Sequence, residues 1–253
     1  MITNDKETKT IKSDVTVLDI IEYLREVDSA RITEISAEVG ISKSSVHAHL
    51  ATLEQRGYAA KEGDQYKLGM CFLNLGASAR NKVPHFDSIR ERVERLANQT
   101  DERTQFVIEE HGQAYVIFRS FGQYAVRARP RIGQPTHLHT SASGKAILSG
   151  LPRERVREII DYWGLPQKTE NTITDRETLF EELDEVRDQG YAVNTGESQG
   201  RFLSAGAPIR TDESILGAIT ISGPEKRMHD RLDDEIIDLL LGVTNELELN
   251  LTN

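Results

Sequence analysis

Residues 32–57 read ITEISAEVGISKSSVHAHLATLEQRG, and this stretch decides the fold of the N-terminal part of the chain. Gly40 separates two helical patterns, because a residue without a Cβ permits the left-handed turn that ends a helix. We expect the first helix to begin at Thr33 as its N-cap and the second to cover residues 43–56 behind a Ser42 cap. Two short helices joined by a turn that contains glycine predict a helix-turn-helix.

The flanking residues extend this motif into a winged domain. Apolar residues recur at helical spacing over residues 15–27, which predicts a preceding helix with Ser13 or Asp14 as its N-cap. Residues 58–61 and 65–68 flank Glu62-Gly63-Asp64, a short turn with glycine in place for positive φ. A two-stranded wing is therefore expected after the helix-turn-helix.

An apolar helix is predicted over residues 69–82, before Pro84. Cys71 lies in its apolar string Met70-Cys71-Phe72-Leu73, so we expect a buried thiol rather than a nucleophile. We interpret the chain as a winged helix-turn-helix domain at residues 1–69, a linker helix at residues 70–83 and a second domain at residues 84–253.

The second domain carries strand patterns at both of its ends and helical patterns between them. Helices are expected over residues 86–98, 142–150, 153–163, 176–189 and 230–249, and strands over residues 104–109, 114–120, 124–129, 136–139, 191–194, 203–210 and 215–222. This grouping favours an α+β domain built on a sheet over a βαβ barrel.

Composition is that of a soluble globular protein. The chain has 253 residues, of which 38% are hydrophobic and 28% charged, and it contains no apolar run of the roughly 20 residues that span a bilayer. The polar start MITNDKETKTIKSD lacks the apolar stretch of a secretory signal. We therefore expect a cytoplasmic location and no membrane partner. A single cysteine excludes an intramolecular disulfide.

The net charge of −10 is unevenly distributed. Residues 1–80 carry 10 Lys and Arg against 12 Asp and Glu, so most of the acidity lies in the second domain. Binding to phosphates normally draws on a basic surface, and the near-neutral first domain predicts that tight DNA binding requires dimerisation. The acidic balance, with 10 lysines against 21 arginines, also fits a cytoplasm of very high salt.

The second helix of the motif carries candidate DNA contacts on its polar face. Side chains that reach phosphates and base edges in the major groove are small, polar or charged and lie in the N-terminal half of the helix. The candidates are Thr33, Ser42, Lys43, Ser44, Ser45, His47 and His49, with Lys61 and Lys67 on the wing as phosphate contacts. For the histidines and the wing lysines, an ordinary solvated side chain is the alternative interpretation.

Seven strings, taken in order, resemble the IclR-type transcription regulators. They are ITEIS at 32–36, ISKSSVH at 41–47, THLHTSASGKAIL at 136–148, TITD at 172–175, RDQGYA at 187–192, AGAPI at 205–209 and ITISGP at 219–224. Individually each string is a weak signal. Together they form a resemblance that extends over about residues 14–250, and the chain is identified as a member of this family, with an acidic composition that suits a haloarchaeal one.

The resemblance implies that the second domain is GAF-like, binds a small-molecule effector and pairs with other subunits as a homodimer or homotetramer on a double-stranded DNA operator. The family's pocket positions fall on Ala142, Ser143, Asn194, Ser204, Thr220 and Ser222. Such amides and hydroxyls suit an organic acid or a sugar derivative. Members of the family often have an acidic residue where this chain has Asn194 and a cysteine where it has Ser204, so the effector is expected to differ from the familiar ketoacids.

Other chemistry finds little support in the sequence. His137 and His139 would share one face of a strand and could ligate a metal, but no carboxylate or third histidine lies nearby, so we expect no metal site. We also expect no cofactor and no catalytic residue, because no nucleophile elbow or phosphate-binding glycine loop is present.

The leading interpretation is a metabolite-responsive DNA-binding regulator, with genes of sugar catabolism, in pentose or sugar-acid pathways, as suggested targets. An enzyme with an accessory winged domain is the alternative. A third interpretation is an architectural protein that uses the winged domain for protein contacts.

Overall fold

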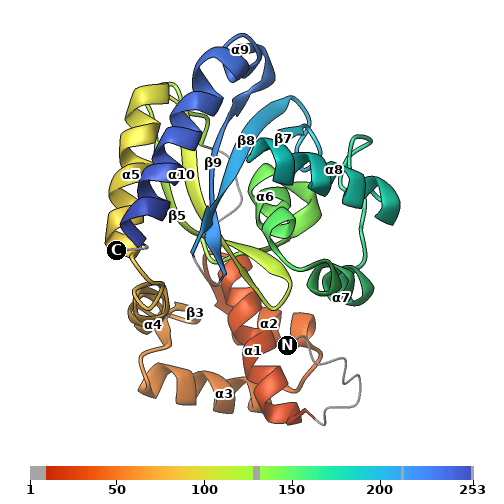
Figure 1. Cartoon of the computed structure of the whole chain (residues 1–253). Coiled ribbons are helices and arrows are strands. Elements are labelled where there is room, and N and C mark those ends of the chain that lie inside the picture. The colour runs from red at the N-terminus through yellow and green to blue at the C-terminus, as the bar shows by residue number, and fades with distance from the viewer. Residues whose placement is uncertain (1–9, 128–131, 212–213, 252–253) are drawn as a thin grey trace. The chain divides into compact units, whose positions relative to one another are not determined.

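The computed structural model describes residues 10–127, 132–211 and 214–251 (Figure 1). The described residues divide into two compact units, residues 10–82 and residues 83–251. Each unit has its own buried core: Ile20, Ile35 and Leu50 belong to the core of the first, whereas the sheet of the second separates two further clusters.

The first unit contains the predicted helix-turn-helix. Helix α1 (Lys12–Glu26) is followed by strand β1 (Ala30–Arg31), helix α2 (Ile32–Val39) and helix α3 (Lys43–Gln55). Gly40 ends α2 at φ +72°, and the Ser42 hydroxyl caps α3 by accepting the backbone N–H of Ser45 at 3.2 Å. The helix-turn-helix and its Ser42 cap are therefore confirmed.

The wing is also present, with one strand more than expected. Strands β2 (Ala59–Glu62) and β3 (Gln65–Leu68) form the antiparallel hairpin, and β3 pairs on its other side with β1. The sequence did not indicate β1, because two residues are too few for an alternating pattern and its partner lies far along the chain.

Two predicted helix caps were wrong. Helix α1 begins with Ile11 in the cap position, ahead of Ser13 and Asp14. Helix α2 begins with Arg31, whose backbone N–H donates to the Glu34 carboxylate at 2.6 Å. Thr33 therefore lies inside the first turn of α2, where its side chain is exposed.

Helix α4 (Cys71–Arg80) buries none of its side chains among the described residues. Its first turn meets the rest of the unit, where the rings of Tyr58 and Phe72 lie 5.1 Å apart. Cys71 is exposed, with its Sγ 3.6 Å from the carbonyl oxygen of Arg56. The expectation of a buried thiol was wrong, because an apolar string in a helix need not face a core.

The second unit is built on a six-stranded antiparallel sheet of the order β6-β5-β4-β9-β8-β7. The strands are β4 (Arg103–Glu110), β5 (Gln113–Phe121), β6 (Pro135–His137), β7 (Ala192–Thr195), β8 (Phe202–Arg210) and β9 (Ile215–Pro224). The central pair β4 and β9 joins strands from the two ends of the domain. The predicted α+β class is confirmed.

Helices cover both faces of this sheet (Figure 1). Helices α5 (Phe86–Thr100) and α10 (Ile237–Leu251) lie on one face, and α6 (Ala142–Gly150), α7 (Arg153–Trp163) and α8 (Arg176–Gln189) lie toward the other. Side chains alternate along β4, so Phe106 packs in the α5–α10 core and Val107 in the α6–α8 core.

Three expected elements of this unit differ from the structure. Residues 124–127 form no strand, and the rest of that expected strand lies outside the described residues. The strand at 136–139 ends at His137 and gives way to a 3₁₀ turn, η1 (Leu138–Thr140). The helix expected over residues 230–249 is instead a π-helical turn, η2 (Leu232–Ile236), that leads into α10, and a short helix not expected from the sequence, α9 (Glu225–His229), precedes it. Among the helices of the described residues we find no membrane-spanning candidate.

Candidate functional site

The N-terminal half of α3 presents a polar face. Val46, Leu50 and Leu53 face the core of the unit, because they recur at helical spacing. The candidate DNA contacts then fall on the outside: Ser42, Lys43, Ser44, Ser45 and His47 are exposed, and His49 is half-buried. The structure thus places an ammonium group and several hydroxyls at the start of one helix, the arrangement that contacts DNA phosphates.

The wing lysines are already engaged within the hairpin. Lys67 is half-buried and its ammonium group pairs with the Glu62 carboxylate. Lys61 is exposed and lies 5.5 Å from the ring centroid of Tyr66. A phosphate contact by Lys67 would compete with Glu62, so Lys61 is the better placed of the two.

The second unit contains a cavity of about 430 Å³ on the α6 side of the sheet. Of the described residues, these line it: Arg103, Gln105, Val107, Gln113, Ala114, Val116, Gln134, Pro135, Thr136, His137, Thr140, Ser141, Ala142, Ser143, Lys168, Ser198, Gln199, Ser204, Thr220 and Ser222. Five of the six expected effector residues, Ala142, Ser143, Ser204, Thr220 and Ser222, are therefore brought together. The volume is that of a pocket for a small molecule.

The start of α6 forms one wall of the cavity. The Ser141 hydroxyl caps the helix by accepting the backbone N–H of Gly144 at 3.1 Å, which leaves other N–H groups of the first turn without a partner inside the helix. Strand β8 approaches this turn closely at Gly206, where a Cβ would lie 2.7 Å from the carbonyl carbon of Ala142. Glycine at this position keeps the helix end against the sheet.

The floor of the cavity is formed by side chains in register across three strands. Arg103 on β4 pairs with Ser222 on β9, and Ser222 pairs with Ser204 on β8. Two residues along β4, Gln105 pairs with Thr220, and Thr220 pairs with Gly206. Alternate residues point to the same face, so these two rows are about 7 Å apart.

Arg103 and Gln105 were not among the residues expected from the sequence. The guanidinium of Arg103 donates from Nε to the Ser222 hydroxyl at 2.9 Å and lies 5.9 Å from the ring centroid of Phe202. Burial lowers the pKa of Arg103, and the nearby charge of Arg119 lowers it further. Arginine remains protonated at neutral pH despite such a shift, so the floor carries a buried positive charge.

The electrostatic character of the lining contrasts with that of the whole chain. None of the described residues that line the cavity is acidic, although the chain has a net charge of −10. Arg103 and Lys168 contribute positive charge, and the remaining polar groups are hydroxyls, amides and the imidazole of His137. Burial, together with the charge of Lys168, lowers the pKa of His137. A lining of this kind suits a ligand with a negative charge and several hydrogen-bonding groups.

Both regions of the chain match models of one protein family. The model of the IclR helix-turn-helix domain matches residues 17–63, and the model "Bacterial transcriptional regulator IclR C-terminal" matches residues 79–248. The chain belongs to the IclR family. It is thus a DNA-binding transcription regulator whose C-terminal part is a ligand-binding domain.

Similar IclR proteins cover almost the whole chain. The probable HTH-type transcriptional regulator ArcR of Halobacterium salinarum is 32% identical over 98% of this chain and 97% of its own length. The HTH-type transcriptional regulator KdgR of Escherichia coli is 29% identical over 93% of this chain and 91% of its own. The IclR crystal structure of Thermotoga maritima has the same fold, with a TM-score of 0.79, 21% identity and coverage of 96% of this chain and 100% of the other. These relatives are regulators rather than enzymes, so the alternative of an enzyme with an accessory winged domain is set aside.

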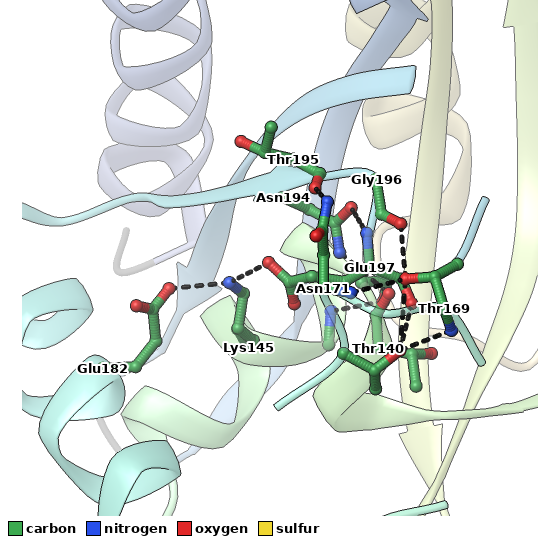
Figure 2. Close-up of polar contacts among 12 residues, drawn as sticks. Thr140, Lys145, Thr169, Asn171, Glu182, Asn194, Thr195, Gly196 and Glu197 are labelled. Atoms are coloured by element: carbon green, nitrogen blue, oxygen red, sulfur yellow. Dashed lines mark hydrogen bonds and ion pairs between the residues drawn. The ribbon is translucent and has the colours of Figure 1, made fainter. Parts of the chain in front are cut away.

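The IclR resemblance implied that Asn194 lines the effector pocket, but Asn194 is not among the residues that line this cavity. Its side-chain N–H donates to the carbonyl oxygen of Thr140 at 2.8 Å, and its Oδ1 accepts the backbone N–H of Glu197 at 3.2 Å (Figure 2). The side chain is buried. Because its amide is used on both sides to hold neighbouring backbone, the structure places Asn194 behind the lining rather than in it.

A buried ion-pair cluster lies beside Asn194 (Figure 2). The Nζ of Lys145 on α6 lies 2.6 Å from Oε1 of Glu182 on α8 and 2.8 Å from Oε1 of Glu197. The Lys145 side chain is 1% exposed and that of Glu197 is 9% exposed. Burial raises the pKa of Glu197, although the charge of Lys145 opposes this effect. Lys145 was indicated in the sequence only by its place in the string Ser143-Gly144-Lys145.

The segment that leads from this cluster into the lining is held on several sides. The Thr169 hydroxyl donates to the carbonyl oxygen of Gly196 at 2.8 Å. The Thr172 hydroxyl donates to the carbonyl oxygen of Glu197 at 2.7 Å. Directly after Glu197, Ser198 and Gln199 reach the cavity lining. The geometry therefore connects the cavity wall to α6 and α8 through a well-bonded segment.

The two histidines considered as metal ligands do not form a metal site with their neighbours. His139 lies in η1, is buried, and its Nε2 is 3.2 Å from the carbonyl oxygen of Pro166. The rings of His137 and His139 lie 5.8 Å apart. Within the described parts of the chain, no group of three or more metal-binding side chains comes together.

Proposed function

We propose that this IclR regulator binds a pseudo-palindromic operator through α3 and changes its affinity for that operator when a small hydroxylated acid enters the cavity of the second unit. The observation that carries the proposal is the cavity lining, in which positive charge, amides and hydroxyls surround a volume of about 430 Å³ and none of the described lining residues is acidic. We also propose that the chain acts in the cytoplasm.

The lining favours a sugar-derived acid over an aromatic one. Eight hydroxyl side chains and four glutamine amides line the cavity, whereas no Phe, Tyr or Trp does so among the described lining residues. Hydroxyls and amides both donate and accept hydrogen bonds, as sugar hydroxyls require. Genes of sugar-acid or pentose catabolism are therefore the proposed targets.

Oligomerisation is part of the proposed mechanism. Symmetric homo-oligomers read symmetric half-sites, and the near-neutral charge of residues 1–80 makes one domain a weak binder. A homodimer or homotetramer would place two α3 helices on the same operator.

Footprinting of the full chain on DNA upstream of its own gene and the neighbouring genes tests the DNA half of the proposal. We expect a protected region with two-fold symmetry, and Lys43→Ala should weaken protection while Lys226→Ala, which removes an exposed lysine from α9, should not. Absence of any protected region would overturn the proposal.

Calorimetry tests the effector half. Sugar acids and aromatic acids are titrated into the full chain, and saturable heat of binding without turnover is expected for a sugar acid. Binding confined to aromatic acids would contradict the proposed ligand class.

A further inference from the structure

The cavity contains two places that attract a negative charge, and they lie at different positions on its wall. One is the N-terminal turn of α6, with Ser141 as its cap. The other is Arg103 on β4, in the row that continues to Ser222 and Ser204. Gly206, which contacts the first turn of α6, belongs to the next row, with Gln105 and Thr220. Arg103 is thus about 7 Å further along the sheet than the row beneath the helix end.

Gln105, two residues from Arg103 on the same face of β4, supplies a second, independent observation. Its side chain is 5% exposed and lines the cavity, yet its Nε2 is buried without a hydrogen-bond partner in the described structure. Burying an amide donor unpaired is unfavourable, and most buried donors have a partner. A ligand atom that accepts a hydrogen bond would supply that partner.

The two places differ in the strength of their charge. A helix N-terminus is equivalent to about half an elementary charge, and α6 has only nine residues. Arg103 carries a full charge, is 7% exposed, and its planar guanidinium suits a carboxylate. The N–H groups at the start of α6 can instead donate to the oxygen of an uncharged ligand hydroxyl.

The third row of the sheet shows what lies beyond the polar rows. Val107 follows Gln105 on the same face of β4, and Val116 of β5 is its register partner. Both line the cavity. Along β4 the cavity floor thus changes from the cation of Arg103, through the amide of Gln105 with the hydroxyl of Thr220, to the aliphatic side chains of Val107 and Val116.

We propose that the effector's carboxylate binds at Arg103 and Gln105, and that its hydroxyl groups point toward the start of α6. The inference rests on the proposed function and narrows the ligand to a polyhydroxy monocarboxylic acid held by its acidic end on β4. Arg103 and Gln105 are then the residues that make the cavity bind an acid more tightly than the corresponding neutral sugar or amide.

Calorimetry on the full chain with matched pairs of ligands tests this assignment. The probes are D-gluconate and D-xylonate, each compared with its neutral amide, and 4-hydroxybenzoate compared with 4-hydroxybenzamide. The variants are Arg103→Gln, which removes the charge, and Gln105→Glu, which places a negative charge beside it. Arg157→Gln removes an exposed arginine from α7 and is the matched control.

The wild-type protein and Arg157→Gln should bind a sugar acid more tightly than its amide. Arg103→Gln and Gln105→Glu should each weaken binding of the acid about 10- to 100-fold, the range for a hydrogen bond to a charged group, and should change binding of the amide by less than about 3-fold. Thermal unfolding followed by Trp163 fluorescence identifies a variant that fails to fold, and the other variant then carries the test.

The alternative outcomes separate the two proposals. If a sugar acid binds and both folded variants keep wild-type affinity, or if the amide binds as tightly as the acid, the assignment of Arg103 and Gln105 is overturned while the sensor function stands. If 4-hydroxybenzoate alone binds and loses affinity in the variants, the anchor stands and the polyhydroxy class is overturned. If no probe binds, the proposed effector class is overturned together with this inference.

Discussion

Replacement of Lys145 by Met should destabilise the second unit strongly. The substitution removes the ammonium group that lies 2.6 Å from Glu182 and 2.8 Å from Glu197, while the similar length of Met avoids a large cavity. Removing one partner of a buried ion pair costs about 3–5 kcal/mol, because the other charge is left buried and uncompensated. The Glu182 side chain is 29% exposed, so water compensates part of its charge. We therefore expect a loss of about 3 kcal/mol at pH 8.

This loss should depend on pH in a definite direction. Burial raises the pKa of Glu197, and Lys145→Met removes the charge that opposes this shift. A carboxyl whose pKa is higher in the folded than in the unfolded protein stabilises the fold below the unfolded pKa, and this contribution is lost as the pH rises through the folded pKa. The variant should therefore lie closer to wild type at pH 5 than at pH 8, by about 1 kcal/mol or more, since one pKa unit corresponds to about 1.4 kcal/mol.

Fluorescence of Trp163 provides the assay. It is the single tryptophan of the chain and lies on α7 of the second unit, so its signal in urea reports the unfolding of the unit that contains Lys145. Measurements at pH 5 and pH 8 use one protein concentration, because oligomerisation shifts the apparent stability. The control is Lys145→Met combined with Glu197→Gln, which should be more stable at pH 8 than Lys145→Met alone. Equal losses at both pH values, or a double variant no more stable than the single one, would refute the reasoning.

The remaining predictions concern three separate sites. Lys43→Ala should weaken operator binding far less in molar salt than at low salt, because phosphate contacts weaken steeply with salt; fluorescence anisotropy measures this, and equal losses would contradict it. Gly206→Ala should lower the free energy of unfolding by about 2 kcal/mol or more, since its Cβ would lie 2.7 Å from the backbone of Ala142; a thermal midpoint equal to that of wild type would contradict the close approach. Burial lowers the pKa of His139 to about 4, so stability from this neutral imidazole should be lost as the pH falls from about 6.5 toward 4; an NMR titration midpoint near 6 would contradict this expectation.

The helix-turn-helix could be predicted because its signals are local. Ser42 as a cap, Gly40 as a helix end and the spacing of Val46 and Leu50 lie within a dozen residues of one another, and each matches its place in the structure. Strand β1 could not be predicted in this way, because it has two residues and pairs with a strand more than 30 residues later. Exposure of Cys71 was missed for a related reason, since an apolar helix pattern does not state what the helix packs against.

The cavity floor shows the same limit in the functional site. A strand that carries Arg103 and Gln105 on one face reads, from the sequence alone, as a strand with a solvated polar face. Only the tertiary structure shows that both side chains are buried and line the cavity. The Ser and Thr residues of β8 and β9 could be proposed only through the IclR strings, because alternating hydroxyls on a strand are common at a wet sheet surface.

The DNA-binding and effector-binding halves of the regulator should respond differently to salt. The side chains of α3 that we propose as phosphate contacts are exposed, so their contribution to DNA binding should fall as salt rises. The charges of Arg103 and Lys145 are buried at 7% and 1% exposure, where screening by ions is weak.

A ligand shifts an equilibrium only by its difference in affinity for the two states. At high salt the effector should therefore keep most of its affinity, while the affinity for DNA falls. If the effector opposes DNA binding, a given effector occupancy should release DNA more completely at high salt than at low salt. If the effector favours DNA binding, the complex with DNA should be stable at high salt only when the effector is bound. Fluorescence anisotropy of labelled DNA, measured with and without effector at two salt concentrations, distinguishes the two cases. If the change in DNA binding caused by the effector shrinks with salt in parallel with the DNA affinity, the anion is held at the solvent-exposed rim of the cavity rather than at Arg103.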